Sequence, residues 1–150
     1  MCKSLSQEDH SEGYESVANG GISHAEGYGC VSSGMFSHAE GRGCEAKGHT
    51  SHAEGALTIA SGSRQHVQGQ CNIEDTEDKY YDIIGNGYDT DHRSNASAID
   101  KVGNQYLAGN LYVGTTDWAN PATDAAHKVA TEKFVTDLFN TLVNGDEVSY

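Results

Sequence analysis

The chain has 150 residues and a formal net charge of −13, because 22 acidic side chains outnumber 9 basic ones. Leu, Ile, Val and Phe together make up only 24 residues, and low apolar content combined with high charge is typical of disordered proteins. The acidic balance argues against a nucleic-acid partner, since phosphate binding needs a basic patch. No apolar stretch is long enough to predict insertion into a membrane.

A repeat with a constant period of 14 residues in the first half of the chain argues against disorder. Its motif is Ser-His-Ala-Glu-Gly. Two variant copies and three regular copies lie at 9–13, 23–27, 37–41, 51–55 and 65–69. A second motif that also ends in glycine lies half a period away, at 16–20, 30–34, 44–48 and 58–62. One repeat therefore consists of two short half-units, each closed by glycine.

Each half-unit alternates small with large residues, which is the pattern of a β-strand, and the period is too short for repeats built from helix pairs. The repeat over 7–71 therefore predicts a parallel β-solenoid. Successive coils would stack about 4.8 Å apart, so that five coils form a rod about 24 Å long.

Small side chains share one face of each predicted strand, so the coil has little room inside. They are Ser11, Ala25, Ala39 and Ala53 in the first strand and Ala18, Ser32, Ala46 and Ala60 in the second. Glycines are expected where the backbone turns sharply or takes a positive φ. These turn glycines include Gly27, Gly34, Gly41, Gly48, Gly55 and Gly62. Because one chain buries little surface, it should gain a core by packing against copies of itself.

The sequence pattern changes after the repeat. A β-rich neck is predicted over 72–116, with a strand at 79–84, a polar loop through Ser94 and a hairpin turn at 102–104. A linker and an amphipathic helix are predicted over 117–150. The apolar stripe of this helix is Val135, Leu138, Phe139, Leu142 and Val143. Its three turns are too short to be stable alone, so the helix should dock on the neck or join a three-helix bundle.

The repeat motifs, exemplified by 23–27 and 58–62, resemble the head repeats of trimeric autotransporter adhesins. The His-Ala-Glu-Gly version is more similar to phage and prophage tail-fibre proteins of Gram-positive bacteria, and the segments at 65–69, 72–75, 93–96, 109–114 and 128–132 extend this likeness. The resemblance implies a homotrimer in which each chain forms a left-handed parallel β-roll, followed by a β-meander neck and a short C-terminal helix. It also implies location in the virion and contacts with other tail-fibre or baseplate proteins.

Histidine and glutamate form two neighbouring columns on the same strand face. The histidines are His10, His24, His38, His52 and His66, and the glutamates are Glu12, Glu26, Glu40 and Glu54. A column of carboxylates repels itself unless another group compensates. The adhesin family carries apolar residues at the equivalent positions, facing the trimer axis. The resemblance therefore implies an axial ladder of His24, Glu26, His38, Glu40, His52 and Glu54 that pairs between chains. The alternatives are a solvent-exposed face, or zinc or nickel bound by the five histidines with carboxylates.

The four cysteines do not match the spacing of a zinc motif. Cys30 and Cys44 occupy one column on adjacent coils, where parallel stacking makes a disulfide awkward, so buried thiols are expected. Cys2 and Cys71 are placed outside that column.

No catalytic residue, cofactor or enzymatic activity is predicted, because the chain lacks the motifs of phosphate-binding loops, serine hydrolases and zinc proteases. The expected role is a structural and adhesive segment of a tail fibre that binds a glycan or protein on the bacterial cell surface. The alternatives are a passive trimeric spacer or the head fragment of a bacterial surface adhesin. Exposed aromatic residues would be the receptor contacts, namely Tyr14, Tyr28, Phe36, Tyr88 and Trp118.

Overall fold

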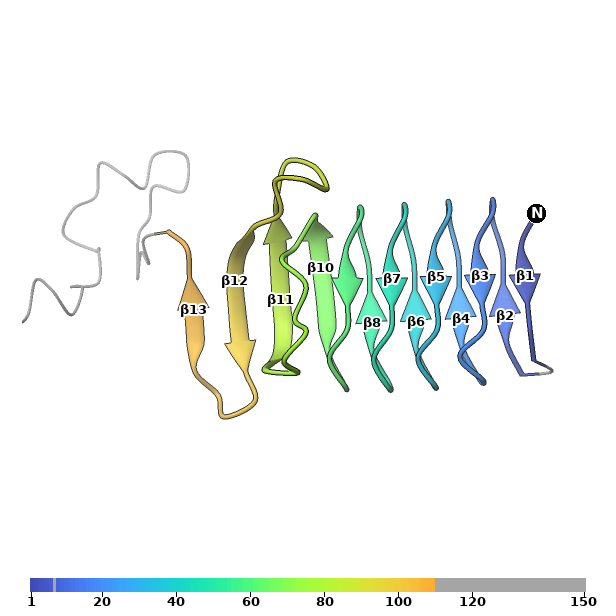
Figure 1. The fold of residues 1–150 in the computed structure, drawn as a ribbon, viewed down its shortest axis with the longest axis horizontal. Helices are drawn as coiled ribbons and strands as arrows, with labels where there is room; N and C mark the ends of the chain where they lie inside the picture. The colour runs from blue at the N-terminus through green and yellow to red at the C-terminus, as the bar shows by residue number, and fades with distance from the viewer. Residues whose placement is uncertain (7, 110–150) are drawn as a thin grey trace, which may run out of the picture. The chain divides into compact units, whose positions relative to one another are not determined.

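The computed structural model describes residues 1–6 and 8–109, and this part of the chain is a β-solenoid followed by longer strands (Figure 1). Nine two-residue strands form the coils: β1 (Lys3–Ser4), β2 (His10–Ser11), β3 (Val17–Ala18), β4 (His24–Ala25), β5 (Val31–Ser32), β6 (His38–Ala39), β7 (Glu45–Ala46), β8 (His52–Ala53) and β9 (Ile59–Ala60). Four longer strands follow: β10 (His66–Gln70), β11 (Tyr80–Asn86), β12 (Asn95–Asp100) and β13 (Gln105–Leu107). The prediction of a mainly β chain with stacked coils is confirmed.

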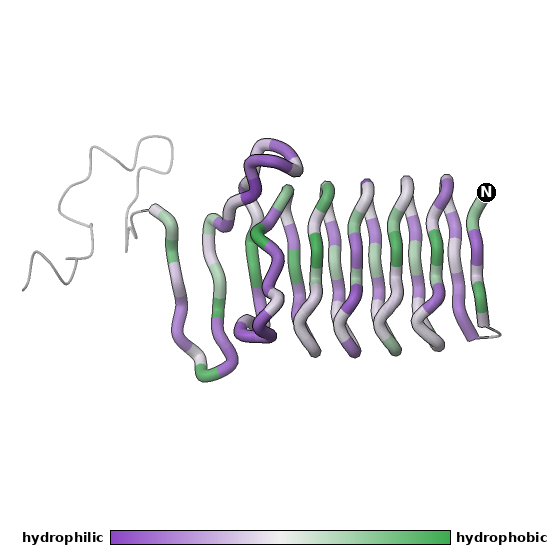
Figure 2. The backbone as a smooth tube through the Cα atoms, in the orientation of Figure 1, coloured by the Kyte–Doolittle hydropathy of each residue, from purple (hydrophilic) through white to green (hydrophobic). Residues whose placement is uncertain are grey.

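The coils run back and forth between two sheets. The odd-numbered strands from β1 to β9 form one sheet, in the order β1-β3-β5-β7-β9. The second sheet contains the even-numbered strands of the coils together with the longer strands, in the order β2-β4-β6-β8-β10-β11-β12-β13. Up to β10, each coil pairs in parallel with the next at a shift of one repeat, so that His24 lies beside His38 and Val17 beside Val31. Because β1 pairs with β3, the stack already begins before the first Ser-His-Ala-Glu-Gly motif. Hydrophilic and hydrophobic segments alternate along each coil (Figure 2).

The interior of the coils is filled by the small side chains that the repeat predicted. Seven of them are completely buried: Ala18, Ala25, Ser32, Ala39, Ala46, Ala53 and Ala60. Ser11 is only half-buried because β2 is the edge strand of its sheet. With alanine and serine inside, each coil closes over two residues per strand, and the fold needs few large apolar groups.

Two physical causes account for the two glycine columns, a left-handed backbone and close stacking of the coils. Gly27, Gly41 and Gly55 take φ values of 95°, 105° and 102°, where a side chain would be strained. Gly34 and Gly48 do not have a positive φ, but a Cβ at either position would overlap the backbone of the glycine one coil later. The turn that follows Gly48 takes its left-handed residue at Thr50, with φ 54°. A Cβ at Gly27, Gly41 or Gly55 would also overlap the glycine backbone of the next coil, so close stacking requires glycine in both columns and the positive φ is an additional requirement in the first.

The first sheet ends at β9, where a side chain replaces the next strand. Asn72 accepts a hydrogen bond from the Ile59 amide at 2.7 Å and donates one to the Ile59 carbonyl at 2.9 Å. This side-chain amide covers the open edge of β9 and satisfies buried backbone groups. The second sheet continues because β10 pairs in parallel with β11.

The strands after the solenoid agree with the sequence pattern. β11 pairs with β12, and β12 with β13, in antiparallel register. The predicted hairpin turn at 102–104 therefore joins β12 and β13. The carboxylate of Asp100 organises this turn, because it accepts hydrogen bonds from the backbone amides of Val102 and Asn104 and from the Tyr106 hydroxyl.

Several predictions for the C-terminal part concern residues that the structure does not describe. The amphipathic helix, the linker over 117–150, the last part of the neck beyond residue 109 and Trp118 all lie outside the described residues. Within 1–6 and 8–109 there is no helix of the length and apolar character needed to span a membrane.

Candidate functional site

The histidine column forms a stack along the even-numbered strands. Neighbouring ring centroids from His24 to His66 lie 4.6, 4.8 and 5.0 Å apart, with interplanar angles of 5°, 5° and 26°. His10 at the edge differs, since its ring meets His24 edge-on at 4.9 Å and 68°. The side chains of the inner histidines are each 34% to 37% exposed, and that of His10 is 65% exposed. The stack is therefore a half-exposed surface feature.

Glutamates lie beside the stack and link successive coils. The Glu40 carboxylate lies within hydrogen-bond distance of His52 Nε2, at 3.2 Å, and the Glu54 carboxylate lies at the same distance from His66 Nε2. Nearer the N-terminus the same pairs are longer: Glu12 lies 3.9 Å from His24 Nε2 and Glu26 lies 3.9 Å from His38 Nε2. We call the five histidines and four glutamates the His/Glu ladder.

The pairing in the ladder is between coils of one chain. The strand register places each histidine beside the next one, and each glutamate reaches the histidine of the following coil. The shared face of His and Glu, expected from their spacing, is confirmed by these distances. Pairing across a trimer axis stays a prediction.

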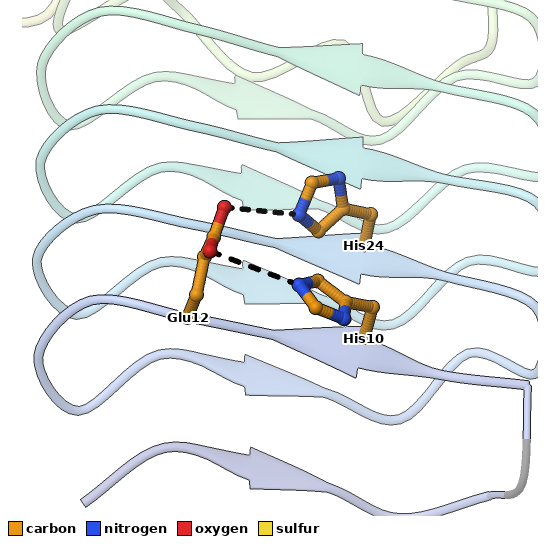
Figure 3. A group of neighbouring side chains, drawn as sticks. All are labelled: His10, Glu12 and His24. Carbon is orange, nitrogen blue, oxygen red and sulfur yellow. Dashed lines mark ion pairs between the residues drawn. The ribbon is translucent and has the colours of Figure 1, made fainter.

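Loose contacts in the first coils leave two ring nitrogens without hydrogen bonds. His24 Nε2 and His38 Nε2 are buried and have no hydrogen-bond partner among the residues that the structure describes. Three groups bring potential metal ligands within 4.8 Å of one another, namely His10–Glu12–His24, Glu26–His38–Glu40 and Glu40–His52–Glu54. In Figure 3, the rings of His10 and His24 both direct a nitrogen at the Glu12 carboxylate. Imidazole and carboxylate are ligands that divalent transition metals accept.

The ladder ends at Asp82, a residue that the sequence pattern did not single out. Its carboxylate lies 3.2 Å from His66 Nδ1, on the side of the ring opposite Glu54. His66 is paired with Asp82 in the β10–β11 register, so this coil is 16 residues long instead of 14. The repeat period could not reveal Asp82, because the two extra residues shift the column.

The predicted receptor contacts form one stacked pair and two separate residues. The rings of Tyr14 and Tyr28 stack in parallel at 5.1 Å and are 54% and 57% exposed. Phe36 is 48% exposed and meets the His49 ring edge-on, and Tyr88 is 84% exposed in the loop after β11. The tyrosine column does not continue, because Arg42 and Ala56 occupy the next two positions.

All four cysteines lie in the described part and are free thiols, and Cys30, Cys44 and Cys71 are buried. The expectation of buried thiols at Cys30 and Cys44 is confirmed. The placement of Cys2 outside their column was wrong: β1 pairs with β3 in a register that puts Cys2 in line with Ser16, and hence with Cys30. The weaker motif before His10 hid this first coil.

Buried serines form a further column that the motif contains but whose role was not predicted. Ser37 Oγ donates to the Gly34 carbonyl at 2.6 Å, and Ser23 Oγ donates to the Asp9 carboxylate at 2.9 Å. The column ends at Gln65, whose amide donates to Asp75 at 2.9 Å. The Ser37 hydroxyl satisfies a turn carbonyl and the Ser23 hydroxyl a carboxylate, whereas Ser51 Oγ is buried without a hydrogen-bond partner among the described residues, so these bonds account for only part of the column.

No family model, no curated protein and no solved structure matches the chain. The likeness to adhesin and tail-fibre repeats therefore rests on the repeat motifs themselves.

Proposed function

We propose that the chain is a structural and adhesive segment of a phage or prophage tail fibre. It would act as a homotrimer, with three left-handed rolls side by side, and would contribute to recognition of the host cell surface. The observation that carries this proposal is the solenoid itself, in which one 14-residue coil is repeated along an axis with the same side chains at the same positions. We assign no catalytic residue to it.

A stack of parallel coils suits a mechanical role. Each coil donates backbone hydrogen bonds to the next along both sheets, for example from the His24 amide to the Ser37 carbonyl at 3.0 Å and from the Val31 amide to the Cys44 carbonyl at 2.8 Å. Such a rod resists bending because any bend must stretch hydrogen bonds on one side. Stiffness is what a fibre needs to hold a binding surface away from the particle.

Trimer formation is supported by what a single chain leaves incomplete. The interior holds mainly alanine, serine and cysteine, so burial of large apolar side chains contributes little. One side of the rod carries the half-exposed His/Glu ladder, with buried ring nitrogens that lack hydrogen bonds within the described residues. Packing this side against two further copies would exclude water from the ladder and provide polar partners in the same repeat.

The adhesive part of the proposal rests on the stacked Tyr14 and Tyr28. The two rings stack on each other and are half-exposed, so a glycan would contact the exposed parts of the stacked pair, and a trimer would present this patch three times. Linked weak sites gain avidity without any new contact. A passive spacer would need the rod but not these rings.

An adhesive fibre segment would bind to host cells, whereas a passive spacer would not. Fluorescently labelled protein is incubated with a panel of Gram-positive cells and purified cell walls, and the bound fraction is measured. The double substitution Tyr14→Ser and Tyr28→Ser should reduce binding on the cells that retain the unchanged protein, whereas Val102→Ser, at an even more exposed apolar position in the hairpin, should not. Absence of binding across the panel would favour the spacer, and equal binding of both variants would exclude the tyrosine pair as the contact.

A further inference from the structure

The first two coils hold a set of side chains with the composition of a metal site. We propose that His10, Glu12 and His24 bind one divalent transition-metal ion, with zinc as the representative, through the two Nε2 atoms and the Glu12 carboxylate (Figure 3). Water would complete the coordination in a single chain, because the triad lies at the exposed edge of the ladder, and polar groups of neighbouring copies would take its place in a trimer. The inference concerns groups within one chain, so it holds whether or not three chains assemble.

The distances between the imidazole nitrogens and the carboxylate oxygens of the triad suit ligands that share one metal ion better than direct hydrogen bonds. Glu12 Oε2 lies 3.8 Å from His10 Nε2, and Glu12 Oε1 lies 3.9 Å from His24 Nε2. Both separations are too long for hydrogen bonds. Two ligand atoms that each lie about 2.1 Å from one ion can be at most about 4.2 Å apart, and about 3.4 Å apart at a tetrahedral angle. A shift of about half an ångström by these exposed side chains would therefore close the site.

An unpaired buried atom points to the same place. His24 Nε2 is buried and has no hydrogen-bond partner within residues 1–6 and 8–109, although it lies between two carboxylates. Buried polar atoms without a partner are rare, and an ion is one of the few groups that satisfies a ring nitrogen in such a position. The edge-on meeting of His10 and His24 also distinguishes this pair from the parallel rings deeper in the stack.

Charge favours a cation at this position. The ladder places four glutamates in one column of a chain with a formal charge of −13, and a bound cation would offset their mutual repulsion. Glu40 and Glu54 each share a hydrogen bond with a histidine at 3.2 Å, which an ion would have to replace. The Glu12 side chain makes no hydrogen bond to any described residue, so a metal ion would displace nothing there.

The test uses the full chain with Cys2→Ser, which removes the one partly exposed thiol. Chelator-treated protein is titrated with Zn²⁺ by calorimetry, and with Co²⁺, whose visible absorption reports the number and type of ligands. The expected result is one tight ion per chain. Replacing a ligand, as Glu12→Gln or His10→Gln, should weaken binding by at least the roughly 10- to 100-fold seen on loss of outer-shell partners.

Glu54→Gln is the matched control, because it changes the same column outside the triad and should leave the tight site unchanged. Circular dichroism establishes that each variant is folded, which is expected since the His10 and Glu12 side chains are 65% and 58% exposed. The proposal is overturned if Zn²⁺ produces no saturable binding and Co²⁺ no visible band. It is also overturned if Glu12→Gln and Glu54→Gln weaken binding equally, since the ion would then belong to the ladder as a whole.

Discussion

Glycine occurs in the coils for two reasons, a left-handed backbone and close stacking on the next coil. Single glycine-to-alanine substitutions at three positions can separate these two reasons. Gly29 has φ +64° and open space around a built Cβ, with no described atom within 4 Å. Gly34 does not have a positive φ, but its Cβ would lie 2.6 Å from the carbonyl carbon of Gly48 and closer still to the oxygen. Gly41 combines both features, with φ +105° and a Cβ that would overlap the carbonyl oxygen of Gly55.

Each feature has a characteristic free energy. A left-handed backbone conformation disfavours a residue with a Cβ by about 1–2 kcal/mol, which is the loss expected for Gly29→Ala. Forcing a methyl group between closely packed backbones destabilises by about 1–3 kcal/mol, which is the loss expected for Gly34→Ala. Gly41→Ala should lose about the sum, 2–5 kcal/mol, a large part of the 5–15 kcal/mol that stabilises a typical domain.

Urea unfolding followed by far-ultraviolet circular dichroism measures these differences. The expected order of destabilisation is Gly41→Ala, then Gly34→Ala, then Gly29→Ala, with unchanged slopes. Coils that can move apart to admit a methyl group would make Gly34→Ala as mild as Gly29→Ala or milder. That result would refute the close-stacking explanation of the second glycine column.

Two further predictions concern titration and reactivity. Burial alone would raise the pKa of Asp100, but hydrogen bonds from Asn104, Tyr106 and Val102 outweigh burial and lower the pKa to about 2. This carboxylate therefore contributes stability that is present above the ordinary aspartate pKa near 4 and is lost as pH falls through about 2. Asp100→Asn should be less stable than the unchanged protein at pH 7, with a difference that shrinks between pH 4 and pH 2; a constant difference would contradict the assignment. Iodoacetamide should modify Cys2 well before the three buried cysteines in folded protein, and all four in urea, as read by mass spectrometry; early modification of Cys30 would show that the coils open.

The regular part of the fold could be predicted because it depends on a local rule that is repeated. Each motif supplies a small inward residue, an outward histidine and a glycine, and the same pairing recurs wherever the period is kept. Prediction failed where the motif is lost or the period changes. The first coil lacks the motif, so Cys2 was misplaced, and the longer coil between β10 and β11 brings Asp82 to His66 without a signal in the spacing.

In the candidate site, too, the features set by local residue spacing could be predicted, whereas the features that depend on contacts between coils could not. The spacing of His24 and Glu26 places both on one strand face, and the structure has them there. Which contacts are tight and which are loose could not be predicted, because identical motifs give 3.9 Å at His38 and 3.2 Å at His52. That difference depends on position in the stack, between an open edge at β2 and the longer strands beyond β10.

The proposed fibre segment depends on three chains acting together, and the mass of the protein in solution tests this most directly. Size-exclusion chromatography coupled to light scattering should give about three times the 16.0 kDa of one chain at micromolar concentration. A folded monomer would contradict the proposal: the roll would be stable by itself, the His/Glu ladder would face solvent, and the avidity expected of a trimeric fibre would be lost.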